Sequence, residues 1–316
     1  MNIAHVSDLH LLALDGVSPT RFIGKRATGW LNIRLKRGSV HRISYARAIL
    51  RQIALVGVEH VVITGDLTNL ALESEFALAR DVLQGDLGLD PSRVTIVPGN
   101  HDLYTRGSAR SRRFERSFAS WLESDLPELA TDVPGGRFPI VKLRGPVAIV
   151  ALSSAVPRLP LIAAGELGKA QLAALGRVLG HPEVTRRGLV LALHHPPLRS
   201  DESRLKGYLE GLRDAPELLA RIRALSRGLI LHGHLHRRVQ RTVPSGGSVV
   251  QVGATSASLH DDAPDRMAGF NLYEVDEFGA LTLACAHVYS PTTGEFHVRS
   301  VPVHLPAQTR SPKPVH

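Results

Sequence analysis

The stretch LILHGHLHRR, from Leu229 to Arg238, places three histidines within five positions directly after a run of apolar residues. A short apolar run of this kind is typical of a buried strand, and the end of such a strand rarely needs several imidazoles. His232 lies within the apolar pattern and is expected to be packed or hydrogen-bonded. His234 and His236 are two positions apart, so on an extended segment their side chains point to the same side. They are candidate metal ligands, with a solvated turn as the alternative.

Four other apolar runs also end in side chains that can bind metal. SDLH follows the strand predicted at residues 3–7, GDLTN follows 60–64, PGNHD follows 94–97 and HHPP follows 189–193. The candidate site residues of these clusters are Asp8, His10, Asp66, Asn100, His101, Asp102, His194 and His195. The carboxyl ends of parallel strands lie side by side at one edge of a sheet, where ligands bind. The five loops are therefore expected to converge on one place.

The residue types in these loops indicate which ions could bind there. Aspartate, histidine and asparagine without thiolates suit Mn, Fe, Co or Zn, whereas Ca prefers an all-oxygen cage. Cys285 is the only cysteine, which excludes a site built from several thiolates. Gly65, Gly99 and Gly233 each precede a candidate ligand by one residue, and a glycine allows the close backbone approach that a crowded ion site needs.

Strand and helix patterns alternate over the first two thirds of the chain, and strands dominate the last third. Strands are predicted at 3–7, 60–64, 94–97, 139–143, 147–152, 189–193, 229–231, 248–252, 270–275, 281–288 and 295–299. Helical patterns occur at 42–56, 73–87, 114–122, 167–179 and 216–225. Near-continuous apolar strands are expected to be covered on both faces. The prediction is an α/β domain with a β-rich C-terminal half over residues 1–300, built from two packed sheets, and a flexible tail at 301–316.

The overall composition narrows the class of protein. The formal net charge is +9, and a basic surface attracts phosphates, nucleic acid or anionic lipid, although a solvated arginine-rich surface is an equally simple explanation. No apolar run approaches the roughly 20 residues that cross a membrane. The N-terminus lacks the features of a signal peptide, and a single cysteine favours a reducing compartment, so a cytoplasmic location is expected.

The ordered motifs D-L-H, G-D, G-N-H-D, H-H-P-P and G-H-L-H, from Asp8 to His236, resemble those of the calcineurin-like metallophosphoesterases. The resemblance implies a two-sheet α/β sandwich of mixed sheets, flanked by helices, with two divalent metal ions (Mn, Fe or Zn) at one edge. Matched by position, one ion would be held by Asp8, His10, Asp66 and His236, and the other by Asp66, Asn100, His194 and His234, with Asp66 bridging.

The resemblance also implies a reaction. A hydroxide bridging the two ions would attack the phosphorus of a phosphate ester. His101 matches the family's histidine near the leaving group, and Asp102 would orient it. The predicted activity is that of a phosphodiesterase acting on a small-molecule or nucleotide-like ester.

Other activities are compatible with the same centre. One is a membrane-associated pyrophosphatase acting on a nucleotide-linked lipid, similar in kind to UDP-diacylglucosamine hydrolases. A nuclease, a phosphomonoesterase and a binding or scaffold protein without turnover are further alternatives. Nucleic acid is not the favoured partner, because no separate DNA-binding module is evident.

Two basic segments could select the substrate. Residues 18–38 form a basic amphipathic pattern, with 21–37 as a candidate for contact with the inner face of an anionic membrane or as a lid; an ordinary surface helix is the alternative. Arg106, Arg110 and Arg113 lie at helical spacing after the GNHD loop and could hold a substrate phosphate. A solvated helix face is the alternative there. His195 is a further candidate for substrate contact.

Overall fold

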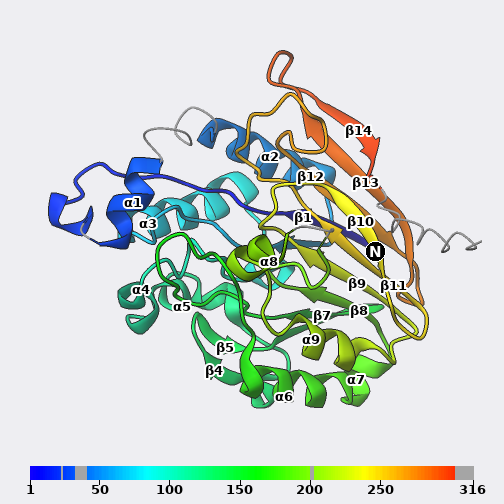
Figure 1. The fold of residues 1–316 in the computed structure, drawn as a ribbon. Helices are drawn as coiled ribbons and strands as arrows, with labels where there is room; N and C mark the ends of the chain where they lie inside the picture. Colours follow the sequence, from blue (N-terminus) through cyan, green and yellow to red (C-terminus); the bar gives the residue numbers. More distant parts are fainter. Residues whose placement is uncertain (23, 33–40, 200–202, 303–316) are drawn as a thin grey trace, which may run out of the picture.

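The computed structural model describes residues 1–22, 24–32, 41–199 and 203–302 of the chain. Two six-stranded sheets pack against each other, and helices cover their outer faces (Figure 1). This architecture confirms the predicted α/β sandwich with mixed sheets flanked by helices.

The order of strands is β14-β13-β12-β1-β2-β3 in the first sheet and β10-β11-β9-β8-β7-β6 in the second. The strands of the first sheet are β1 (Asn2–Val6), β2 (His60–Ile63), β3 (Val94–Ile96), β12 (Gly269–Val275), β13 (Leu281–Tyr289) and β14 (Phe296–Ser300). Those of the second are β6 (Ile140–Arg144), β7 (Val147–Ala151), β8 (Gly188–Ala192), β9 (Arg227–His232), β10 (Val239–Val243) and β11 (Ser248–Gly253). A separate ribbon pairs β4 (Thr131–Val133) with β5 (Gly136–Phe138).

The direction of the strands decides where the predicted ligands meet. In the first sheet β1, β2 and β3 run parallel, and in the second β7, β8, β9 and β11 run parallel. Parallel strands present their carboxyl ends at a common edge. The loops after β1, β2, β3, β8 and β9, which carry the candidate ligands, therefore gather at one edge of the sandwich.

The helices cover the sheets and connect their strands. They are α1 (Lys25–Asn32), α2 (Ile43–Val56), α3 (Glu73–Val82), α4 (Arg106–Arg110), α5 (Arg113–Ser117), α6 (Gly168–Leu179), α7 (Pro182–Thr185), α8 (Arg204–Glu210) and α9 (Ala215–Ile222). Single turns of 3-10 helix occur at Pro19–Phe22, Pro91–Arg93, Ala119–Leu122 and Pro127–Leu129, and a π-helical turn occurs at Leu83–Leu87. In the part of the chain that the structure describes, no helix is both long and apolar enough to span a membrane.

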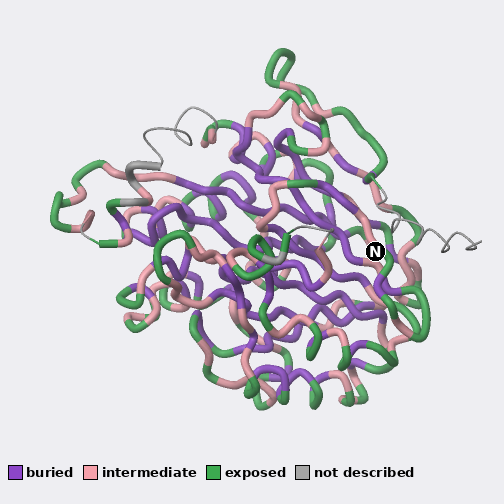
Figure 2. Tube along the Cα trace, viewed as in Figure 1, coloured by how far each residue is buried: buried purple, intermediate pink, exposed green. Residues whose placement is uncertain are grey.

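Strands β7 and β8 of the second sheet are buried on both faces, as their apolar runs predict (Figure 2). Val147 and Ile149 on β7 pack in the core between the sheets, whereas Ala148 and Val150 pack in the core beneath α6 and α9. Apolar side chains on both faces of these strands are thus removed from water, and burial of apolar surface is the main favourable contribution to folding.

Three strands were not predicted. Strands β4 and β5 have only three residues each, and the edge strand β10 has three polar residues between its two valines. Such strands lack both the apolar run and the clear alternation on which the prediction depended.

Two helical predictions were too long. The predicted 73–87 helix ends at Val82 and continues as the π-helical turn, which Gly88 closes with φ 61°. The arginine-rich helix breaks at Arg112, which has φ 49°, so Arg106 and Arg110 lie on α4 while Arg113 begins α5. The three arginines therefore do not share one helix face.

The basic segment at 18–38 is only partly described, since residues 23 and 33–40 lie outside the described residues. Its described part divides at Gly24, which has φ 73°, into the turn Pro19–Phe22 and the helix α1. Arg26 is buried and donates to the Leu70 and Ala71 carbonyls, and Arg21 pairs with Glu73. These contacts favour a helix packed on the body of the protein.

The predicted tail begins later than expected. Val301 is buried, and the Pro302 carbonyl accepts a hydrogen bond of 2.7 Å from the Gln240 amide of β10. Residues 301 and 302 thus belong to the folded part of the chain; the rest of the predicted tail, 303–316, lies outside the described residues.

Candidate metal centre

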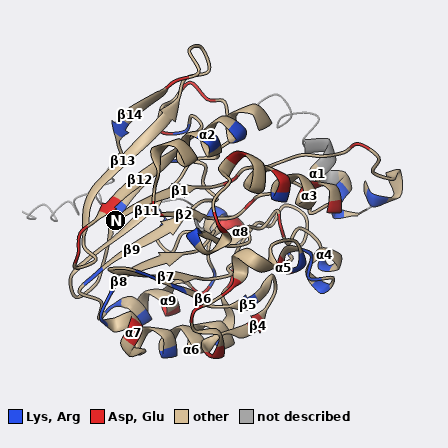
Figure 3. Ribbon diagram, turned by 180° about the vertical axis from the view of Figure 1, so that it is seen from behind, with Lys and Arg blue, Asp and Glu red and all other residues tan. Residues whose placement is uncertain are grey.

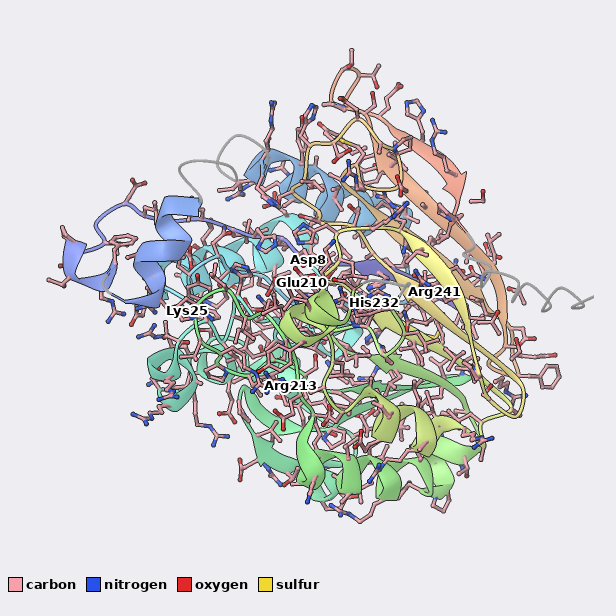
Figure 4. All side chains as sticks on the ribbon, in the orientation of Figure 1. Asp8, Lys25, Glu210, Arg213, His232 and Arg241 are labelled. Carbon is pink, nitrogen blue, oxygen red and sulfur yellow. The ribbon has the colours of Figure 1, made fainter. Side chains whose placement is uncertain are left out.

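The seven predicted ligands lie together at the carboxyl edge of the two sheets. We call this set the candidate metal centre; it comprises Asp8, His10, Asp66, Asn100, His194, His234 and His236. Asp8 and Glu210, both of which contact His234, lie beside each other at the centre of Figure 4. Contacts among the side chains of these loops show that the five loops converge, as expected.

The ligands assigned to the first ion face one another across short distances. His10 Nε2 lies 3.1 Å from His236 Nε2, and His236 Nε2 lies 3.2 Å from Asp8 Oδ1. Asp66 Oδ2 is 3.9 Å from His10 Nε2. Four side chains from three loops thus direct lone-pair atoms into one small volume.

The ligands assigned to the second ion form an adjoining group. His194 Nε2 lies 3.4 Å from Asp66 Oδ2 and 3.1 Å from Asn100 Oδ1. His234 Nδ1 is also 3.1 Å from Asn100 Oδ1. Asp66 Oδ2 is close to nitrogens of both groups, which is the position that a bridging carboxylate would need.

The chemistry of these side chains fits divalent metal ions. Asp8 Oδ1 is buried without a hydrogen bond, and the two facing Nε2 atoms of His10 and His236 cannot both donate to each other. Two of the side-chain groups with metal-ligand spacing are Asp8 with Asp66 and His194, and His194 with His195 and His234. Imidazole, carboxylate and amide donors together suit Mn, Fe or Zn.

Hydrogen bonds on the far side of the rings fix which nitrogen faces the centre. His194 Nδ1 donates to the Thr64 carbonyl at 2.7 Å, and His234 Nε2 donates to the Glu210 carbonyl at 2.9 Å. A ring nitrogen held in this way leaves the opposite nitrogen as the one with a lone pair, as in most metal-binding histidines.

Five of the candidate ligands have left-handed backbone conformations. Asp8, His10, Asp66, His234 and His236 have φ values between 46° and 69°. A residue with a Cβ pays about 1 kcal/mol or more for such a conformation, and strain of this kind clusters at functional sites. The sequence pattern does not indicate these backbone conformations.

All three predicted glycines are required by space, since a Cβ atom on Gly65 would lie 2.6 Å from the Gly99 backbone nitrogen. A Cβ atom on Gly99 would overlap Asp66, and a Cβ on Gly233 would overlap Ser7 and Asp8. The backbone next to Asn100 and His234 can thus lie directly against the carboxylates only if these positions are glycine.

Comparison with known proteins agrees with this geometry. A sequence profile described as calcineurin-like phosphoesterase matches residues 1–238. The chain belongs to the calcineurin-like phosphoesterases. It is therefore a metal-dependent phosphoester hydrolase. No curated protein sequence matches it.

Solved structures show the same fold at low sequence identity. A dimetal phosphatase from Danio rerio is 15% identical with a TM-score of 0.53, and the match covers 86% of this chain and 92% of that protein. A purple acid phosphatase from yellow lupin (Lupinus luteus) seeds is 11% identical with a TM-score of 0.57, and the match covers 94% of this chain and 52% of the lupin protein. The likeness concerns the fold alone.

Electrostatics within this phosphoesterase centre favour charge on the carboxylates. Burial opposes ionisation of Asp66, but His194 and His101 outweigh it and lower the pKa of Asp66 well below its usual range. Burial likewise lowers the pKa of His194, but Asp66 outweighs it and raises the pKa to about 9. Without metal, a proton on His194 thus balances Asp66, and a bound cation would replace that proton.

His101 and Asp102 lie beside the phosphoesterase centre in different roles. His101 Nδ1 donates to the Asn69 carbonyl at 2.6 Å, and the ring stacks on Tyr104. The buried Asp102 carboxylate instead accepts from the amides of Gly99, Leu67 and Thr68. Asn69, and not Asp102, holds the His101 ring; Asp102 ties together the loops after β2 and β3.

The substrate-binding candidates of the phosphoesterase lie elsewhere than expected. Lys and Arg gather around α4 and α5 (Figure 3), but Arg106, Arg110 and Arg113 are not among the described residues that line the cavity at the metal centre. Arg113 pairs with Glu73 and donates to the Ala71 carbonyl.

His195 is fully buried: one ring nitrogen donates to the Ala163 carbonyl and the other contacts Ser154 Oγ. It supports the loop after β8 and has no exposed surface to offer a substrate.

One histidine at the phosphoesterase centre was not predicted. His41 belongs to none of the five predicted ligand clusters, yet its ring lies edge-on to that of His10, 4.8 Å between centroids. It follows a basic stretch with no strand pattern, so the sequence contained no signal of this placement.

Proposed function

We propose that this protein is a phosphodiesterase that holds two divalent ions, Mn, Fe or Zn, at the candidate metal centre. The supporting observation is a cavity of about 730 Å³ that begins at Asp66, Asn100 and His101 and continues past the loop after β9 along β10. A cavity of this size has room for a substituent on the phosphoryl group beyond the leaving group, as a diester has.

The far wall of the cavity is suited to a polar or anionic substituent. Val239 and Arg241 are two positions apart on β10, so they lie on the same face of the strand, and both line the cavity. Lys206 from α8 and Arg266 from the loop before β12 line it as well. A substituent with negative charge, such as a nucleotide, would be attracted to this wall.

Each residue has a distinct part in the proposed reaction. Two divalent ions bound here would polarise the phosphoryl group and lower the pKa of a water molecule. Asp66 would hold both ions, and the remaining ligands would fix their positions. We assign to His101 the proton transfer to the leaving group, through Nε2, since Nδ1 is engaged by Asn69.

A turnover screen tests the proposal. Metal-free protein supplied separately with Mn, Fe, Zn or Mg would be assayed on bis(p-nitrophenyl) phosphate, p-nitrophenyl phosphate and a pyrophosphate diester. We expect kcat/KM for the diester to exceed that for the monoester at least about tenfold, which is about 1.4 kcal/mol of transition-state binding. Asp66→Ala should abolish every activity.

The other outcomes identify the alternatives. Faster turnover of the monoester would make the protein a phosphomonoesterase. Binding of two ions without turnover of any ester would indicate a binding protein. A nuclease would bind DNA with an affinity that falls steeply with salt, since such binding depends on release of counterions.

A lipid-linked pyrophosphate is a second candidate substrate, favoured by an apolar surface beside the cavity. Leu159, Leu161, Leu205 and Tyr208 are exposed, and Leu161 is 90% exposed. The two segments that carry them are joined by the hydrogen bond from the Ala163 amide to the Leu209 carbonyl. Ala163 and Lys206, from the same segments, line the cavity.

This second candidate corresponds to a nucleotide-linked lipid of the UDP-diacylglucosamine type and to peripheral contact with a membrane. Co-sedimentation with anionic liposomes that is lost in Leu161→Ser and Leu205→Ser variants would favour it. Loss on removal of residues 21–37 would instead assign the contact to the basic segment. A protein that stays in the supernatant with every vesicle would leave a cytoplasmic small-molecule esterase, the location we propose from the single cysteine.

A further inference from the structure

His41 enters the metal centre from outside the five motif loops. Its backbone pairs with Leu259 in an isolated bridge, and the next amide, that of Arg42, donates to the Ser258 carbonyl at 2.8 Å. These bonds attach His41 to the loop that follows β11. Since β11 runs parallel to β9, this loop leaves the second sheet at the same edge as the loop with His234 and His236.

The His41 ring is held by two serines. Its Nδ1 lies 2.7 Å from Ser258 Oγ and 3.4 Å from Ser256 Oγ. Ser256 Oγ in turn donates to the Asp8 carbonyl at 2.6 Å. The ring is thus tied to the backbone of the first ligand of the chain.

The orientation of the ring repeats the pattern of the predicted ligands. His194 and His234 each donate one ring nitrogen to an oxygen, which leaves the other nitrogen for the centre. Ser258 Oγ can accept from His41 Nδ1 in the same way, which leaves Nε2 as the nitrogen with a lone pair.

The distances are compatible with a shared ion. Potential ligand nitrogens of His10, His41 and His236 all lie within 4.8 Å of one another. Two nitrogens bound to one ion can be at most about 4.2 Å apart, twice a metal–nitrogen bond of about 2.1 Å. Nitrogens at the 4.8 Å limit would have to approach one another by about 0.6 Å to reach this separation, and by more for ligands that are not on opposite sides of the ion. The ring centroid of His41 is 4.8 Å from that of His10 and 5.7 Å from that of His236.

We propose that His41 is an additional ligand of the first ion, the one assigned to Asp8, His10, Asp66 and His236. The inference rests on the proposed metal centre and adds to it a third imidazole at this position. A set with three imidazoles favours Zn, Co or Fe over Mg, because nitrogen donors bind these ions more strongly than they bind Mg. His41 would thus contribute to the choice of metal as well as to affinity.

The test compares wild type with His41→Ala and His41→Gln. Metal-free proteins would be titrated with Co(II) and Zn(II), with the visible absorption of Co(II) and the metal content of the dialysed protein as readouts. We expect both variants to lose at least about tenfold in Zn affinity at one of two sites and to change the Co(II) spectrum of that site. Binding at the second site should be unchanged.

His260→Ala is the matched control. His260 lies on the same loop as Ser258, and its Nδ1 contacts the Tyr45 hydroxyl instead of the centre. This variant should bind both ions as wild type does. Thermal melting of each metal-free variant shows whether it is folded. If His41→Ala is unfolded without metal, the folded His41→Gln variant is used for the test.

The outcomes separate this inference from the proposed function. A Co(II) spectrum and Zn affinity unchanged in both His41 variants would overturn the assignment of His41 and leave the rest of the centre intact. Wild-type protein that binds neither metal would overturn the metal centre itself. Equal losses in His41→Ala and His260→Ala would show a general effect on the loop and would also overturn the assignment.

Discussion

Three consecutive residues of the GNHD loop do three different things. Asn100 Oδ1 contacts His194 and His234 within the metal centre. His101 lines the cavity, and Asp102 is buried beneath the loop. Neighbouring side chains of a tight loop point in different directions, so one short motif can supply a ligand, a group that meets the substrate and an internal support.

The role assigned to His101 can be tested by removing its ring. In His101→Ala we expect kcat on a diester to fall about 100-fold or more, the usual contribution of a positioned acid. Metal content should stay at the wild-type value, because His101 is not an assigned ligand. A smaller loss for an ester with a nitrophenol leaving group, which needs little protonation, would support the role. Full activity on esters with poor leaving groups would contradict it.

Asp102 should matter for stability more than for chemistry. In Asp102→Ala, the amides of Gly99, Leu67 and Thr68 would be left buried without an acceptor. We expect the free energy of unfolding to fall by about 3 kcal/mol or more, measured by urea denaturation. Asp132→Ala removes an exposed partner of Arg112 and should cost less than about 1 kcal/mol. Equal effects of the two substitutions would show that Asp102 is not a structural support.

At the scale of elements, the N-terminus of α3 carries an unusual carboxyl group. Glu75 is buried and accepts from the Leu70 and Leu72 amides, while its Oε1 has no hydrogen-bond partner. Burial raises its pKa to about 7, although these hydrogen bonds oppose the change. The protonated carboxyl group is therefore the favoured form at this helix start below about pH 7.

This shift predicts how stability depends on pH. A carboxyl group whose pKa is higher in the folded protein stabilises the fold fully below its ordinary pKa and loses that contribution as pH rises through about 7. The Glu75→Gln variant has no ionisable group at this position, so it lacks this pH dependence. Relative to this variant, wild type should lose up to about 3 kcal/mol of unfolding free energy between pH 4.5 and 8.

Urea denaturation in EDTA across this pH range is the measurement. Glu128→Gln changes an exposed position, and its unfolding free energy should have the same pH dependence as that of wild type. A constant difference between wild type and Glu75→Gln at all pH values would show that Glu75 keeps its ordinary pKa.

At the scale of the whole molecule, the metal centre joins the two sheets. Asp8 and Asp66 follow strands of the first sheet, whereas His194, His234 and His236 follow strands of the second. Hydrogen bonds already join the two sheets at this edge, such as the bond from His194 Nδ1 to the Thr64 carbonyl. Ions bound by both sets would hold the sheets together at this edge.

Metal binding should therefore stabilise the fold. Free Zn or Mn at about 1,000 times its Kd should add about 4 kcal/mol to the free energy of unfolding, which corresponds to a rise of several degrees in Tm. Calorimetry with metal and with EDTA measures the difference. Asp66→Ala, which lacks the proposed bridging carboxylate, should show little or no rise. The same Tm for wild type under both conditions would contradict a metal site in the folded state.

The order of residues was sufficient to predict the α/β sandwich and the meeting of the seven candidate ligands. Each ligand cluster follows an apolar run, and the carboxyl ends of parallel strands share an edge whatever the details of the loops. Gly99 and Gly233 were also predictable, because a crowded site leaves no room for a side chain beside a carboxylate.

Contacts between distant parts of the chain account for what could not be predicted. The positive φ values of Asp8 and His234 arise from how the loops close, which a local pattern does not record. His41 reaches the centre through serines more than 200 positions away in the chain, and Arg113 pairs with Glu73 instead of facing the cavity. Local sequence preference determines strands, helices and turns, whereas the partner of a side chain depends on which segments packing brings together.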